Sequence, residues 1–102
     1  MAFDMYAGPY SEAIGHHEEF VLQLAYDPEE GGRYSQLSQL WESFYDGPHL
    51  SPQQSNLLVH ELIALQAQHG SANKELGRIV FRLIAFFSAA YTFNLEVVCG
   101  SD

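Results

Sequence analysis

The stretch on which the expected fold depends most is residues 51–70, which read SPQQSNLLVHELIALQAQHG. Ser51 can cap the start of a helix, Pro52 fits the first helical position, and Gln54 completes a capping box. The apolar residues that follow recur at helical spacing and form one buried face: Leu58, Leu62 and Leu65, with Val59 and Ile63 beside them. Gly70 then closes the segment. We therefore predict a helix over residues 52–69.

Three further segments show the same periodicity, at 73–92, 34–45 and 11–25. The segment 73–92 is apolar around most of its circumference, which is typical of a central helix or of one that forms an interface. These patterns predict a mainly α protein, a compact four-helix bundle folded as a single helical domain over residues 1–102. The predicted core consists of large apolar residues from all four helices: Phe20, Leu24, Leu37, Leu40, Trp41, Phe44, Leu58, Leu62, Leu65, Leu76, Val80, Leu83 and Phe87.

The two ends of the chain have a different pattern. Residues 2–6 alternate weakly between apolar and polar positions, and residues 95–99 form a strand-like run. These ends leave room for a short two-stranded ribbon beside the bundle, although a lone pair of strands is only marginally stable without packing on the helices.

Composition limits the class of protein. The chain has 102 residues, and a hydrophobic share of 47% is too high for a disordered tail. Its formal charge of −9 disfavours nucleic acid and anionic membranes as partners. The single cysteine, Cys99, excludes an internal disulfide framework. No secretory signal is visible at the start, and the longest apolar stretch, 79–93, is interrupted by Arg82 and too short to span a bilayer. We expect a cytoplasmic protein.

The histidines do not have metal-ligand spacing. No Glu-x-x-His pair occurs, and the zincin-like start His60-Glu61 has Ala64 where the second histidine would be needed. Cys99, at the end of an apolar run, is typical of a buried small hydrophobe. We therefore expect no metal, no cofactor and no enzymatic activity.

The negative charge is concentrated in residues 1–72, where ten acidic residues face one basic residue, Arg33, while residues 73–102 are neutral overall. Tyrosines lie among these acids at expected helix ends, and tyrosine adds amphipathic contact area to a binding surface. We interpret this combination as a surface for a basic protein partner, with Glu29 and Glu30 as the first residues to test. An acidic surface that serves solubility and helix capping remains the alternative. The predicted partner-binding residues are Glu18, Glu19, Tyr26, Asp27, Glu29, Glu30, Tyr34, Glu42, Tyr45 and Asp46.

In size, acidity, helical layout and the closing segment FNLEVVCGSD at residues 93–102, the chain resembles the small acidic immunity proteins of bacterial toxin systems. This resemblance implies an inhibitor that binds a co-encoded, often basic, toxin domain and occludes or distorts its active site. Helical colicin-type immunity proteins are similar in layout, but no binding residue is carried over from them. The alternative is a helical regulatory or adaptor protein that forms a homodimer through its fourth helix, where Ser88, Ala89 and Ala90 would allow close approach.

Overall fold

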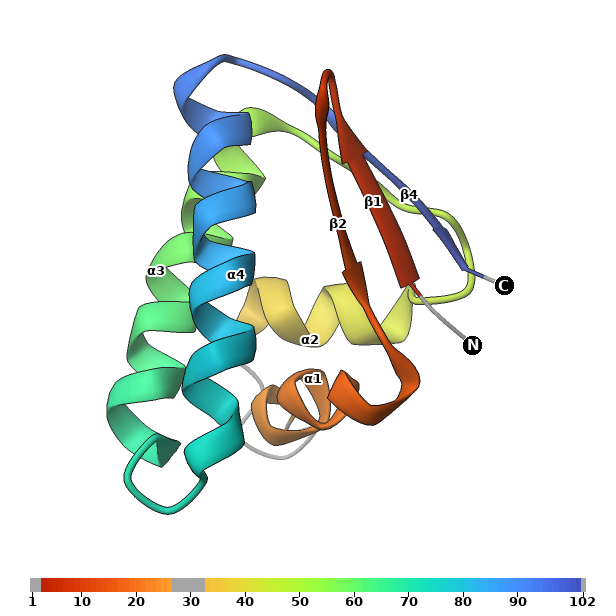
Figure 1. Cartoon of the computed structure of the whole chain (residues 1–102). Helices are drawn as coiled ribbons and strands as arrows, with labels where there is room; N and C mark the ends of the chain where they lie inside the picture. The colour runs from red at the N-terminus through yellow and green to blue at the C-terminus, as the bar shows by residue number, and fades with distance from the viewer. Residues whose placement is uncertain (1–2, 27–32, 102) are drawn as a thin grey trace.

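A computed structural model of the chain describes residues 3–26 and 33–101. Its architecture has two layers, a four-stranded antiparallel sheet and a layer of helices that covers one face of that sheet (Figure 1). The helices are α1 (Phe20–Ala25), α2 (Ser35–Glu42), α3 (Pro52–His69) and α4 (Lys74–Thr92), and a short 3-10 turn, η1 (His16–Glu18), precedes α1. The strands are β1 (Phe3–Ala7), β2 (Tyr10–Ile14), β3 (His49–Leu50) and β4 (Val97–Ser101).

The strand order is β2-β1-β4-β3, so the first and last strands of the chain form the centre of the sheet. Strand β1 pairs with β2 through a two-residue turn and with β4 on its other side, where Met5 lies opposite Cys99. Gly8, the first residue of the turn, has a φ of +56°, a conformation that glycine adopts without strain.

The prediction of an all-helical four-helix bundle is wrong. Residues 11–14, expected to begin the first helix, belong to strand β2, and the α-helical part of the predicted segment covers only Phe20–Ala25. The spacing of Ala13, His17 and Phe20 imitates a helix, but His17 is exposed and the backbone of β2 pairs with β1 instead. The two terminal segments do pair, yet they are the middle of a four-stranded sheet and not an isolated ribbon.

The other three helices lie close to the predicted segments. Helix α3 begins and ends where the sequence predicts, and its capping box is present: Gln54 N–H donates to Ser51 Oγ at 3.1 Å, and Ser51 N–H donates to Gln54 Oε1 at 2.8 Å. None of the helices in the described parts of the chain is long and apolar enough to cross a membrane.

The core lies between the inner face of the sheet and the helices. Most predicted core residues are buried there, but Leu24 is exposed because the short helix α1 directs Val21, Leu22 and Ala25 inward instead. Phe20 and Trp41 are only partly buried and pack against the core. The sheet supplies seven buried residues that the predicted bundle core did not include: Phe3, Met5, Ala7, Ile14, Leu50, Val97 and Cys99.

Candidate partner-binding surface

Within the described parts of the chain, no helix lies on the second face of the sheet (Figure 1). In β1, Phe3, Met5 and Ala7 are fully buried beneath the helices, while Tyr6 between them is 54% exposed. Because successive side chains of a strand point to opposite faces, Asp4 and Tyr6 mark the outer side of the sheet. We call this outer side the open face.

A row of side chains crosses the open face through all four strands. Tyr6 lies opposite Ser11 of β2 and opposite Val98 of β4, and Val98 lies opposite His49 of β3. Glu96, two residues before Val98, places its Oε1 3.3 Å from Nδ1 of His49. The row therefore combines an exposed phenol and an exposed aliphatic side chain with an imidazole and a carboxylate.

The end of α2 continues this surface. Glu42, Tyr45 and Asp46 are all exposed, and Tyr45 is 64% exposed. The chain then runs along the sheet: Cys99 N–H donates to the carbonyl of Pro48 at 3.1 Å, and a Cβ on Gly47 would lie only 3.2 Å from the carbonyl oxygen of Cys99. Gly47 and Pro48 are thus held beside β4, and Tyr45 and Asp46 directly precede them in the chain.

Two of the predicted binding residues are already engaged within the molecule. Glu18 accepts from both terminal nitrogens of Arg82, at 2.7 and 3.0 Å, and from the backbone N–H of Gly15 at 3.0 Å. The Arg82 guanidinium holds the pKa of Glu18 below its ordinary value. Glu19 lies 3.1 Å from His16 Nδ1, with most of its side chain buried. Both carboxylates therefore stabilise the fold locally.

The remaining predicted residues separate into four groups. Tyr34 is buried, and its hydroxyl donates to Gln68 of α3, so it is a packing residue. Tyr26 is half-buried at the end of α1. Asp27, Glu29 and Glu30 lie outside the described residues. The structure brings together only the last group, Glu42, Tyr45 and Asp46.

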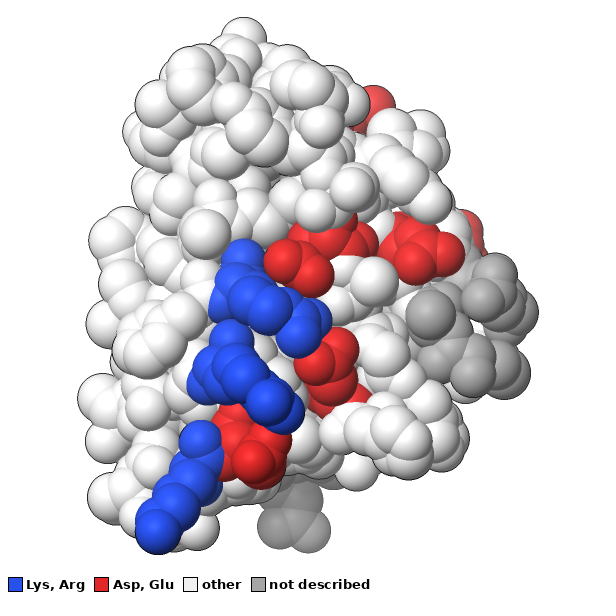
Figure 2. Space-filling model, viewed as in Figure 1, with Lys and Arg blue, Asp and Glu red and all other residues white. Residues whose placement is uncertain are grey.

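The basic residues lie away from the open face. The strands contain no Lys or Arg, Arg33 precedes α2, and the other three basic residues follow one another along α4, on the covered side of the sheet. Figure 2 shows these three as a ridge flanked by acidic side chains. Arg82 is paired with Glu12 and Glu18, and Arg78 with Glu75. The open face therefore keeps its negative charge, while the ridge is largely neutralised.

The free edge of the sheet at β2 is blocked at Ala13. The N–H of Ala13 donates to Glu12 Oε2 at 3.0 Å, and its carbonyl oxygen accepts from Arg82 Nη2 at 3.0 Å. Unpaired backbone groups at a sheet edge are what a further strand would bind, and here side chains occupy them. A partner at this surface would bind through side chains of the open face and not by extending the sheet at Ala13.

A shallow hollow of about 280 Å³ lies on the open face between β1 and β2, lined by Asp4, Tyr6, Ser11, Glu12 and Ala13. Glu12 is committed to Arg82 and to the backbone of Ala13. Among the described residues Asp4 forms no ion pair, so its carboxylate and the Tyr6 ring are the groups there that a cationic side chain could contact.

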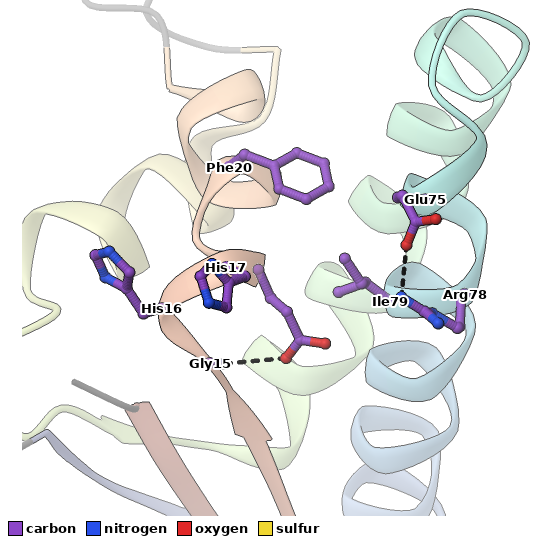
Figure 3. A pocket seen from close by; sticks show the side chains of 8 residues that line it. Gly15, His16, His17, Phe20, Glu75, Arg78 and Ile79 are labelled. Carbon is purple, nitrogen blue, oxygen red and sulfur yellow. Dashed lines mark hydrogen bonds and ion pairs between the residues drawn. The ribbon is translucent and has the colours of Figure 1, made fainter.

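A second hollow, of about 430 Å³, lies between η1, α1 and α4 (Figure 3). Phe20 and Ile79 form its apolar wall, and His16, His17 and Arg78 stand at its rim. The two carboxylates that line it, Glu18 and Glu75, are bonded to Gly15 and Arg78. Both acids are therefore held by structural bonds.

No group of His, Cys, Asp and Glu within residues 3–26 and 33–101 is arranged to hold a metal ion. Cys99 is buried, and burial raises the pKa of its thiol to about 12. A thiol with such a pKa stays protonated at neutral pH and is a poor nucleophile.

Sequence reasoning missed Asp4, Tyr6, His49, Glu96 and Val98. The alternation Phe3-Asp4-Met5-Tyr6-Ala7 was the one available signal, because it places Asp4 and Tyr6 on a common strand face. The register that brings Val98 and His49 beside Tyr6 depends on pairing between distant parts of the chain.

Comparison with known proteins gives no relative for this chain: no protein family, no curated protein and no solved structure matches it significantly.

Proposed function

We propose that this protein is an immunity-type inhibitor, which binds a basic bacterial toxin domain through the open face and the adjoining end of α2, in the cytoplasm of the producing cell. The observation that carries the proposal is the separation of charge. Asp4, Glu42 and Asp46 form no ion pair among the described residues, whereas Arg78 and Arg82 are bound to acids on the covered side.

This arrangement suits a basic partner for two physical reasons. Unpaired surface carboxylates attract a basic domain during diffusion and so raise the association rate. Exposed tyrosines then provide contact area with little conformational freedom to lose, and Tyr6 and Tyr45 stand among the acids. If the toxin is a nuclease, the acids would meet the basic groove that otherwise holds nucleic acid.

The partner is to be identified by gene neighbourhood, or by pull-down from the source bacterium with mass spectrometry. Its affinity should then be measured for two variants that each change the net charge by the same amount. Asp46→Lys alters the proposed surface, and Glu75→Lys alters an equally exposed acid on α4. We expect Asp46→Lys to weaken binding by about tenfold and Glu75→Lys by less than about threefold.

Equal effects of the two variants would mean that only total charge matters and would overturn the assigned surface. An acidic partner would overturn the proposed function itself.

A further inference from the structure

A different part of the surface, where helices α3 and α4 run side by side away from Lys74, exposes large apolar side chains. The two helices cross closely: a Cβ on Gly77 of α4 would lie 3.3 Å from Nε2 of Gln66 on α3. Ile63 lies about one turn before Gln66 on α3, and Phe81 lies about one turn after Gly77 on α4. Because the two helices are antiparallel, both residues lie on the same side of the crossing. Ile63 is 52% exposed and Phe81 is 63% exposed.

About one turn further along the same helix faces, Val59 and Ile84 are partly buried against the core. We call the four residues Val59, Ile63, Phe81 and Ile84 the α3–α4 seam. A large aromatic ring and a branched aliphatic side chain that are each more than half exposed, on neighbouring helices with further apolar residues next along each helix, are typical of an interaction surface.

The seam has no charged residue. The only Asp, Glu, Lys or Arg of α3 is Glu61, and its carboxylate is turned to α2, where it accepts from the backbone N–H groups of Gln36 and Leu37. On α4, Arg82 is turned to β2 and η1, and Arg78 lines the hollow beside α1. Figure 2 shows the consequence, a white surface beside the basic ridge on the α3 side.

We infer that the seam is the contact surface for a second copy of this chain. Two molecules that each carry a charge of −9 repel one another, and the repulsion is least where the facing surfaces are neutral. A two-fold dimer also requires a patch that is complementary to itself, which an apolar patch is and an acidic patch is not. A basic partner gains no electrostatic attraction at an uncharged surface, so the seam fits a second copy better than it fits the toxin.

The test is the mass of the full chain in solution, measured by light scattering after size exclusion at about 50 mM and about 500 mM salt. Dimerisation should move the mass from 11.5 kDa toward twice that value and should strengthen at high salt, because screening weakens the repulsion. This salt response is opposite in sign to that expected for binding of a basic partner. The absence of a dimer would therefore leave the proposed function standing, and the absence of a basic partner would leave the dimer standing.

The variants Phe81→Glu and Ile63→Glu should each raise the dimer dissociation constant at least about 100-fold, since the symmetric interface would bury two carboxylates. Leu57→Glu is the matched control, because Leu57 is 47% exposed on α3, the helix that carries Ile63. Around the helix axis, Leu57 points about a third of a full rotation away from Ile63. It should dimerise like the unmodified chain.

Circular dichroism melts would show whether each variant is folded. Phe81→Ser, which removes the ring without adding charge, serves as a second seam variant. A chain that stays monomeric at high salt and at its highest soluble concentration overturns the inference. A dimer that Phe81→Glu, Ile63→Glu and Phe81→Ser all leave intact, or that Leu57→Glu weakens equally, also overturns it.

Discussion

The guanidinium of Arg82 lies 2.7 Å from Oε2 of Glu18, and the two residues are 64 positions apart in the chain. The same guanidinium donates to the carbonyl oxygen of Ala13 at 3.0 Å. One side chain of α4 thus ties η1 and the edge of the sheet to the helical layer. It also removes Glu18 from the acids that a partner could meet, which is why the site depends on Asp4, Glu42 and Asp46 instead.

Replacing Arg82 should therefore destabilise the fold. Arg82→Gln loses a bidentate ion pair and leaves the Ala13 carbonyl without its donor, at a cost of about 1–2 kcal/mol in the free energy of unfolding. Arg78→Gln is the control, because the pair of Arg78 with Glu75 is exposed on one helix and should contribute less than about 0.5 kcal/mol. Urea unfolding of both variants measures the difference, and equal losses would show that Arg82 has no special structural role.

The same pair should make stability depend on pH. Hydrogen bonding from Arg82 keeps the folded-state pKa of Glu18 below its ordinary value of 4.5, so folding favours the ionised carboxylate. The contribution of Glu18 is complete above that ordinary value and is lost as the pH falls through the lowered pKa. The difference in unfolding free energy between the wild type and Glu18→Gln should accordingly shrink on acidification. A difference that stays constant or grows from neutral to acid pH would contradict this account.

Glu61 should be the cap of α2. The N-cap residue Tyr34 makes no side-chain bond to the helix, and Glu61 accepts from Leu37 N–H at 2.9 Å and from Gln36 N–H at 3.0 Å. We expect Glu61→Gln to lower the free energy of unfolding by about 1–2 kcal/mol, because the helix start loses charge and one of two acceptors. Glu42→Gln, exposed at the other end of α2, should have almost no effect in the same thermal unfolding experiment.

Cys99 should be inert in the folded protein. Its side chain faces the core opposite Met5, and burial raises the pKa of its thiol to about 12. A chromogenic thiol reagent at neutral pH should label it very slowly, and denaturant should restore the rate of an ordinary thiol. Rapid stoichiometric labelling of the native protein would show that Cys99 is accessible.

Helices α2, α3 and α4 could be predicted from the sequence because the signals for them are local. Ser51 and Gln54 cap α3 within one turn. Gly47 has the left-handed conformation, with a φ of +60°, but α2 already ends at Glu42 with Ser43 as its C-cap, so the glycine lies beyond the helix. The sheet could not be predicted in the same way. Strands β1 and β4 come from opposite ends of the chain, and β3 has only two residues, so pattern within a short window does not reveal their pairing.

The candidate site was predictable only in part, for a related reason. Counting charges located the acids but not their partners, since the neighbour of Glu18 is a residue on another helix. Glu42, Tyr45 and Asp46 could be grouped from the sequence because they lie in the last turn of a predicted helix or directly after it. Tyr6, Val98 and His49 were missed because only the register of the folded sheet brings them together.

The measurement that tests the proposed function most directly is the association rate with the identified partner at two salt concentrations, for the wild type and for Glu42→Lys/Asp46→Lys. Acids that steer a basic domain should give the wild type a rate that falls by about tenfold or more as salt rises and the screening length shortens. The variant should associate slowly at low salt and respond weakly to salt, while its dissociation rate changes less. A wild-type rate that is indifferent to salt, or a variant that associates as fast as the wild type, would contradict the electrostatic account of binding.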